Sequence, residues 1–89
     1  MEFNHSQAPW NNRVKYLDYR IVLDANNNKI TLLSHDCREA DMQLITAAPE
    51  LLEALIEMQR NGRKQGWDDK YESSMERARL AIAKALGQQ

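Results

Sequence analysis

The first third of the chain alternates apolar and polar residues, which predicts β structure. One face of an extended strand over residues 14–23 would carry Leu17, Tyr19, Ile21 and Leu23. The opposite face would carry Tyr16, Asp18, Arg20 and Val22. Residues 29–34 resume the alternation, and asparagines 26–28 lie between the two stretches. Because asparagine tolerates the left-handed backbone region, these asparagines predict the turn of a β-hairpin.

The two faces of this hairpin have different expected roles. We expect the face that carries Tyr19 to pack against helices. The other face still presents Tyr16, Val22 and Leu33, and each strand has an open edge. Since two strands alone are marginally stable in water, a second copy of the chain is expected to extend the sheet or pack against it. The sequence therefore predicts a homodimer.

From residue 36 onward the apolar spacing becomes helical. The apolar stripe has spacings of four, three, four and three, and consists of Leu44, Ala48, Leu51, Leu55 and Met58. The stripe keeps its phase through Pro49. Because the first turn of a helix needs no amide hydrogen bond, proline is tolerated there. We favour a short helix over residues 38–47 and a new helix from Pro49, and a single helix kinked at Pro49 remains the alternative.

The rest of the chain predicts two longer helices. Asn61–Gly62 has the residues of a helix end, and the last helix opens near Asp69 or Ser73, each at capping-box spacing, and closes at Gly87. A connection of about seven residues would make these helices antiparallel. The predicted fold is α+β in the order β-β-α-α-α, a hairpin followed by a short helix and the antiparallel pair. Residues 1–12 are expected to be a flexible segment, and residues 13–87 a single domain.

Composition narrows the function classes. The 89 residues include 12 basic and 13 acidic side chains, for a net charge of −1, which argues against a general electrostatic grip on nucleic acid or membrane. Cys37 is the only cysteine, so no internal disulfide can form. The start lacks a signal-peptide pattern, and no apolar run approaches the roughly 20 residues that span a bilayer. We expect a soluble protein of the cytoplasm.

No residue cluster identifies a reaction. His35, Asp36, Cys37 and Glu39 are close in sequence, but a structural zinc site needs four ligands and no second cluster supplies the rest. A strand-to-helix connection capped by Asp36 or Ser34 is the favoured interpretation of the segment. The three glutamates 50, 53 and 57 fall on one helical side, as a solvated face would. We expect no catalytic, cofactor or metal site and no enzymatic activity.

Binding residues are the remaining candidates. The residues expected to contact a partner are Trp10, Tyr16, Arg20, Arg60, Arg63, Lys64 and Trp67. Tyrosine and tryptophan offer large contact areas with a polar tip, and Trp10 could also anchor the N-terminal segment. The basic loop 60–67 could hold phosphates and stack a base. Asp68 and Asp69 dilute its charge, and a soluble loop with Trp67 folded onto the core is the plainer interpretation.

The helical segments carry one family resemblance. Residues 38–40, 44–45 and 47–55 follow the pattern "REAxxxLIxAAPELLEAL", and residues 81–87 read "AIAKALG". Over residues 19–87 the chain resembles small accessory proteins encoded by tailed bacteriophages and prophages, in which a hairpin precedes these helices. Asparagine at 27 or 28 replaces the usual turn glycine, and Asp41 and Met42 replace an Asn-Ala pair.

The resemblance implies a phage accessory gene, whose small products commonly bind and block host proteins. The first hypothesis is therefore a non-enzymatic protein that binds a host protein and inhibits a defence system of the anti-CRISPR or anti-restriction type. The alternative is a small nucleic-acid-binding regulator that uses the basic loop. Salt-dependent affinity for DNA or RNA would favour the alternative.

Overall fold

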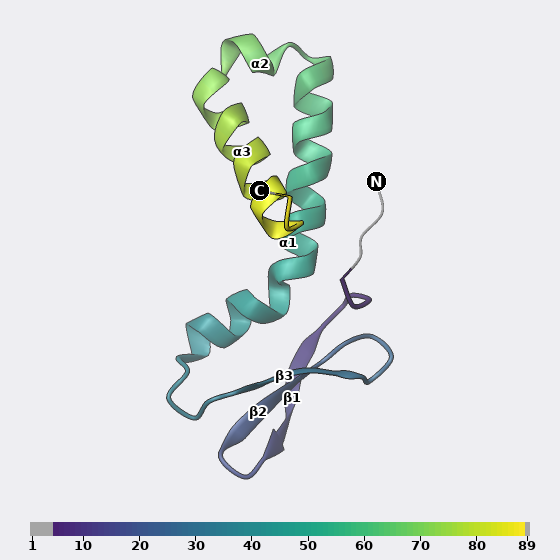
Figure 1. Cartoon of the computed structure of the whole chain (residues 1–89), viewed down its shortest axis with the longest axis vertical. Helices are drawn as coiled ribbons and strands as arrows, with labels where there is room; N and C mark the ends of the chain where they lie inside the picture. Colours follow the sequence, from purple (N-terminus) through teal and green to yellow (C-terminus); the bar gives the residue numbers. More distant parts are fainter. Residues whose placement is uncertain (1–4, 89) are drawn as a thin grey trace. The chain divides into compact units, whose positions relative to one another are not determined.

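A computed structural model describes residues 5–88 of the chain. Three strands precede three helices: β1 (Asn11–Tyr16), β2 (Tyr19–Leu23), β3 (Lys29–Leu33), α1 (Glu39–Lys64), α2 (Trp67–Lys70) and α3 (Glu72–Ala85) (Figure 1). The strands form one antiparallel sheet in the order β1-β2-β3. The chain divides into two compact units, Met1–Glu50 and Leu51–Gln89, with the boundary inside α1. The α+β class is confirmed, with one strand more than predicted.

The extra strand arises at a two-residue turn inside the stretch that the alternation predicted as one strand. Leu17 and Asp18 form the turn, and Tyr16 at the end of β1 pairs with Tyr19 at the start of β2. Leu17 has a φ of 56°, in the left-handed region where leucine is uncommon. The prediction was wrong here because Leu17, which takes the positive φ, is not a residue that normally marks such a turn.

The predicted turn between β2 and β3 is confirmed. Asn27 has a φ of 64°, and the buried Asp24 carboxylate accepts hydrogen bonds from the backbone amides of Asn26 and Asn28, each at 2.9 Å. The Asn28 side-chain amide donates to the second carboxylate oxygen at 3.4 Å. The Asn28 backbone bond is the main reason that the pKa of Asp24 lies below its ordinary value. The ionised carboxylate therefore organises the turn.

The core of the first unit lies on the sheet face that was expected to stay open. Val22 of β2, Leu33 of β3 and Met42 of α1 form a buried cluster, against which Trp10, Ile30 and Cys37 pack. The anchoring role suggested for Trp10 is therefore confirmed. The face assignment was wrong because alternation separates two apolar faces of a sheet but does not say which one a helix covers.

Regular structure starts inside the segment that was predicted as flexible. Residues 1–4 of that segment lie outside the described residues, and β1 begins at Asn11. Asn12 is buried, and its side-chain amide donates to Thr46 Oγ1 at 2.9 Å. The first strand is thus tied to the first half of α1.

Helix α1 continues through Pro49, so the favoured break at this residue was wrong and the single-helix alternative holds. Pro49 is buried. A proline inside a helix removes one amide hydrogen bond and crowds the carbonyl of the residue four positions earlier. The apolar stripe of the sequence runs on unchanged through this position.

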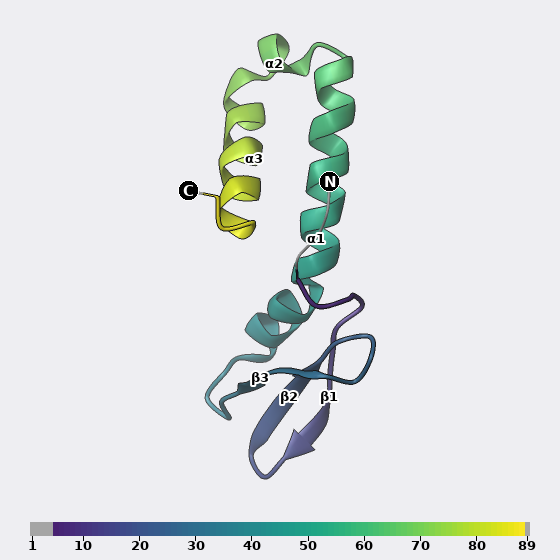
Figure 2. The same cartoon turned by 45° about the vertical axis from the view of Figure 1, so that its right-hand side comes forward.

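The second unit is an antiparallel helical pair, as predicted. α3 returns alongside the second half of α1, and α2 joins the two at one end (Figures 1 and 2). The apolar side chains buried between them are Ile56, Met75 and Ile82. α3 begins at Glu72, and no side chain caps it, so neither predicted capping box forms.

Gly62 has a packing role instead of the predicted helix-ending role. α1 runs past Gly62 to Lys64, and Gly66 takes the left-handed conformation with a φ of 77°. A Cβ atom on Gly62 would lie 2.6 Å from Cε3 of Trp67 and 3.3 Å from Cε of Met75. The missing side chain is what lets the indole of Trp67 reach the helix backbone.

Candidate protein-binding surface

One face of the sheet exposes a row of large apolar side chains. We call it the open sheet face and define it by Val14, Tyr16, Tyr19 and Leu32. Their side chains are between 40% and 60% exposed. Four such residues on one face form a contiguous apolar patch of the kind that marks binding sites on soluble proteins.

The strand register places these residues together. Val14 and Leu32 both pair with Ile21, from β1 and β3 respectively, and directly paired residues share a face. Tyr16 pairs with Tyr19, two residues before Ile21 on β2. Ile21 itself is buried at the centre of the patch. The open sheet face is therefore fixed by backbone pairing.

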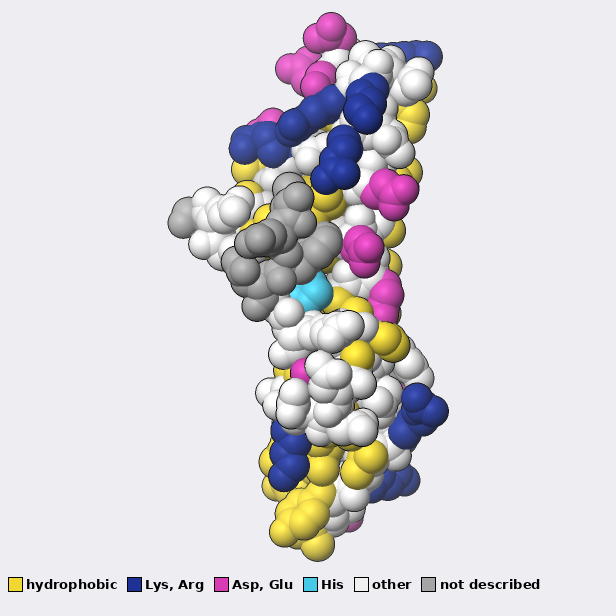
Figure 3. Space-filling view, turned by 90° about the vertical axis from the view of Figure 1, so that its right-hand side faces the viewer, with side chains coloured by type: hydrophobic (Ala, Val, Ile, Leu, Met, Phe, Trp, Pro, Cys, Tyr) yellow, Lys and Arg dark blue, Asp and Glu magenta, His cyan; other side chains and the backbone are white. Residues whose placement is uncertain are grey.

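The β1–β2 turn extends this apolar surface. Leu17 is 78% exposed, the highest value among the large apolar residues of the described chain. Hydrophobic side chains are exposed at this end of the strands (Figure 3). A leucine held at positive φ with its side chain in water gains nothing evident for the fold, so a role in contact is the simplest reason for it.

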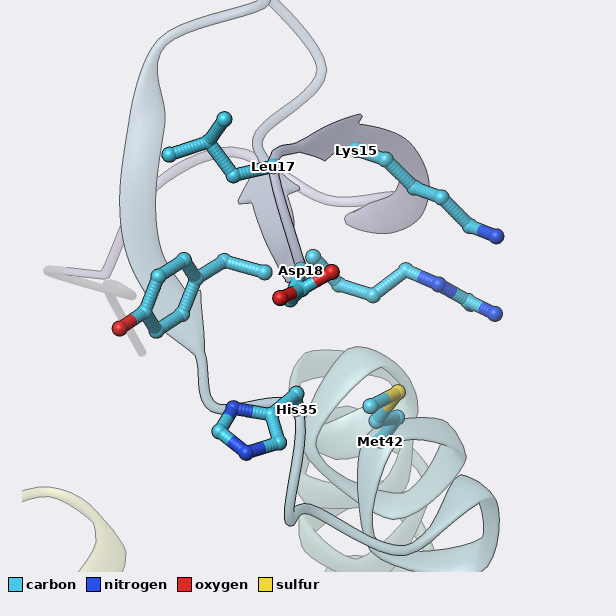
Figure 4. Close-up of a pocket in the computed structure, with 7 residues that line it drawn as sticks. Lys15, Leu17, Asp18, His35 and Met42 are labelled. Atoms are coloured by element: carbon cyan, nitrogen blue, oxygen red, sulfur yellow. The ribbon is translucent and has the colours of Figure 1, made fainter.

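A cavity of about 390 Å³ lies beside the turn, lined by Lys15, Leu17, Asp18, Tyr19, Arg20, His35 and Met42. Asp18 lies between Lys15 and Leu17 on one side and His35 and Met42 on the other (Figure 4). The ring of His35 meets Tyr19 edge to face, and its Nε2 lies 3.3 Å from Asp36 Oδ1. The lining carries Asp18, Lys15 and Arg20, and Arg20 is paired with Glu39, so no concentration of one charge marks the cavity as an ion site.

The sequence candidates of the first unit do not form one site. Tyr16 belongs to the open sheet face. Arg20 lies on the other face, where its guanidinium donates to Asn12 Oδ1 at 3.4 Å and lies 3.5 Å from a Glu39 carboxylate oxygen. Trp10 packs on the core, and its Nε1 donates to the Ser6 carbonyl at 3.0 Å. Trp10 and Arg20 thus make structural contacts.

The candidates of the second unit lie near the end of α1. Arg60, Arg63 and Lys64 are exposed, and Lys and Arg side chains gather over this unit in Figure 3 with acidic side chains beside them. Arg63 lines a shallow groove whose other charged members are Asp68, Glu72, Glu76 and Arg79. Trp67 packs on Gly62 and meets Tyr71 edge to face. Trp67 therefore packs within its own unit, as the plainer of the two interpretations expected. The basic residues have acidic neighbours.

The described part of the chain contains no group of three or more His, Cys, Asp and Glu side chains placed to hold a metal ion. Cys37 is half-buried against the core cluster, and His35 is exposed. Glutamates 50, 53 and 57 of α1 are exposed. Within residues 5–88 no helix combines the length and apolar character needed to cross a bilayer.

Sequence reasoning missed four residues of this surface. Val14, Leu17, Tyr19 and Leu32 were not among the candidates, although Leu17 and Tyr19 were expected on an apolar strand face, which was assigned to the core. The signal that could have found them is the presence of apolar residues on both faces of the hairpin. A single helical layer covers only one face, so one apolar face must stay open unless a partner covers it.

Comparisons with known proteins point to a phage. The family described as Salmonella phage P22 protein Y8K6 has a model that matches residues 1–89. No curated protein and no solved structure matches. The family match confirms the expectation of a small phage protein, whereas the helical sequence pattern remains a resemblance.

Proposed function

Since the chain belongs to this phage protein family, we propose that it is a non-enzymatic accessory protein that binds a host protein in the cytoplasm through the open sheet face. The target that we propose is a component of a host defence system of the anti-CRISPR or anti-restriction type. Binding would block the surface of the target that meets its own substrate or partner.

The observation that carries the proposal is the exposure of Val14, Tyr16, Tyr19 and Leu32 on one side of a three-stranded sheet. A sheet covered on one side normally has polar residues on the other. Here the uncovered side is apolar. Tyrosine side chains pair large contact area with a hydroxyl that can hydrogen-bond at the rim of an interface, so the two tyrosines suit a protein partner.

The chemistry of the patch also limits the partner. The four defining side chains carry no charge, so binding through them should depend on buried apolar area and only weakly on salt. Nucleic acid would require basic contacts and a steep salt dependence. On this unit Arg20 is engaged with Asn12 and Glu39. The exposed basic residues of the strands are Arg13, Lys15 and Lys29, outside the four side chains that define the patch.

The experiment compares the wild-type chain with Leu32→Glu in a bacterium that carries a defined CRISPR or restriction system. Plaques of a phage that the system restricts are counted. We expect the wild-type chain to restore plaque formation and Leu32→Glu to lose this effect, because a carboxylate in the patch would be desolvated on binding. Leu80→Glu is the matched control, since Leu80 is 46% exposed on α3 of the other unit.

Purified chain on resin then tests direct binding in host lysate. A target should be retained by wild type and by Leu80→Glu, and lost with Leu32→Glu. If wild type and Leu32→Glu behave alike in both assays, the open sheet face is not the binding surface. If no defence system responds to the wild-type chain, the inhibition of defence is rejected.

The basic loop keeps the nucleic-acid alternative testable. Affinity for a DNA or RNA duplex is measured at about 50 mM and 200 mM salt, where basic phosphate contacts would produce a large difference. The alternative requires Arg63→Ala and Lys64→Ala to flatten that difference. The protein-binding proposal predicts no nucleic-acid binding that depends on Arg63 or Lys64.

A further inference from the structure

We propose that a second copy of this chain covers an apolar groove of the helical pair, so that two helical units form a four-helix bundle. The inference concerns the second unit alone and does not depend on the identity of any host target. It replaces the sheet as the expected dimer contact and leaves the open sheet face available to another protein.

The groove runs between α1 and α3. Its volume is about 220 Å³, and its lining is almost wholly apolar, with Gln59 and Ser74 as the polar exceptions. The apolar members are Leu55, Met58, Trp67, Tyr71, Met75 and Ala78. Met58 is 59% exposed at its margin, and Tyr71 is also exposed.

The small size of the unit argues that a chain partner fills this groove. The unit comprises only Leu51–Gln89, and the large apolar side chains buried within it are Ile56, Met75 and Ile82. Below about 40 residues a fold usually needs disulfides, a metal or oligomerisation. The chain has one cysteine, and it lies in the other unit. A second copy supplies the missing burial without any further component.

Both helices present apolar residues at the spacing of a bundle seam. On α1, Leu51, Leu55 and Met58 are separated by four and three residues. On α3 the corresponding residues are Tyr71, Met75, Ala78 and Ile82, which are separated by four, three and four positions. Alternating steps of three and four residues keep a stripe facing a partner helix. Met75 and Ile82 are already buried within the unit, so the part of these stripes left to a partner helix is the exposed groove margin with Met58 and Tyr71.

The charges favour a twofold pairing of identical units. In the second half of α1 the acidic residues 53 and 57 precede the basic residues 60, 63 and 64. In α3 the acidic residues 72 and 76 precede the basic residues 77, 79 and 84. A twofold axis across the helices makes equivalent helices antiparallel. The acidic half of each then lies near the basic half of its copy, and the helix dipoles are opposed favourably.

Light scattering on the full chain after size-exclusion chromatography, from about 1 mM to about 1 µM, tests the proposal. The mass should rise toward twice 10.3 kDa with concentration. Met58→Glu should weaken the dimer at least about a hundredfold, since each copy would bury an unpaired carboxylate. Leu80→Glu is the control, because Leu80 lies about 200° around α3 from Ala78.

Two further measurements keep the outcome clear. Far-UV circular dichroism checks that Met58→Glu remains folded. Intermolecular NOEs in a mixture of methyl-labelled-methionine and unlabelled wild-type chains should involve the methyl groups of Met58 and Met75, and not that of Met42. If Met58→Glu fails to fold, the wild-type NOEs alone decide whether the helical groove is the dimer contact.

Three results would overturn the proposal. A mass of 10.3 kDa across the whole range would exclude any dimer. A dimer broken by Leu32→Glu but not by folded Met58→Glu would place the contact on the sheet. Intermolecular NOEs to Met42 alone would place it in the first unit. A constant mass of 10.3 kDa leaves the host-binding proposal standing, because that proposal depends on the plaque and lysate assays. A dimer through Leu32 would instead place a second copy on the open sheet face.

Discussion

The Asn12 side-chain amide donates a hydrogen bond of 2.9 Å to Thr46 Oγ1, across 34 positions of the chain. The same amide lies 3.4 Å from the Met42 carbonyl, and the Thr46 hydroxyl donates to that carbonyl at 2.7 Å. On its other side Asn12 accepts from Arg20 at 3.4 Å. This buried polar link joins β1 and β2 to α1 in the first unit.

Replacing either partner should therefore destabilise the first unit. Asn12→Ala is expected to lower the free energy of unfolding by about 1–3 kcal/mol, since the half-buried polar groups of Thr46 and Arg20 lose a partner. Thr46→Val, which keeps the side-chain volume, should cost about 1 kcal/mol. Urea unfolding measures both. Asn11→Ala is the control: Asn11 is less buried and bonds only its near neighbour Arg13 among the described contacts, so an equal loss there would contradict the prediction.

Leu17, the residue at positive φ in the β1–β2 turn, gives a prediction of increased rather than decreased stability. Leu17→Gly should stabilise the fold by about 0.5–1 kcal/mol, because glycine removes the strain at φ 56° and little buried surface is lost. Thermal unfolding measures the gain. Asn27→Gly should gain less, since asparagine already tolerates its φ of 64°. If Leu17 contacts the target, the stabilised variant should nonetheless bind it more weakly.

The Asp24 turn predicts a dependence of stability on pH. Hydrogen bonds, first of all from the Asn28 backbone amide, lower the pKa of the folded-state carboxyl. The stabilisation is therefore fully present above the unfolded-state pKa of about 4 and is lost as the pH falls through the folded-state pKa. We expect the urea midpoint of wild type to exceed that of Asp24→Asn at pH 6, with a difference that narrows below pH of about 4.

Comparison of these two proteins isolates the Asp24 effect. The pKa of Glu76 is also lowered, by its hydrogen bond with Arg79, but that pair is present in both proteins and cancels. A midpoint difference that stays constant between pH 6 and pH of about 3 would show that the charge of Asp24 does not organise the turn.

The contact between Gly62 and Trp67 predicts that the effect of Gly62→Ala on stability changes sign with the residue at position 67. Gly62→Ala should destabilise the second unit by about 1 kcal/mol, because crowding against the indole outweighs the better helix propensity of alanine. In a Trp67→Leu background the same change should become stabilising by about 0.5 kcal/mol. Chemical unfolding of the four proteins in the cycle measures the coupling. Equal effects in both backgrounds would contradict the packing seen here.

Local structure was predicted correctly where residue type alone determines the backbone conformation. The asparagines after Asp24 predicted the β2–β3 turn, and the helical spacing predicted the antiparallel pair. The β1–β2 turn was missed because Leu17 adopts a conformation that leucine rarely takes. Pro49 was read as a helix start because its position in the apolar stripe fits either a first turn or an interior, and tertiary burial makes that choice.

The candidate surface was harder to predict than the fold. Tyr16 was identified because tyrosine has interface character, but its neighbours depend on the register between strands. Trp10, Arg20 and Trp67 have the side chains of binding residues and use them inside the fold. Which face of the sheet is covered depends on where α1 lies, and residue spacing within a strand contains no information on that.

Each unit is continuous along the polypeptide, and this affects the order of events during synthesis. All three strands and the Thr46 side chain belong to the first 50 residues, so every pairing partner of the sheet exists before the helical pair has been translated. Neighbouring segments find one another quickly because short loops close at low entropic cost. The N-terminal half can therefore begin folding on the ribosome, without waiting for the C-terminus.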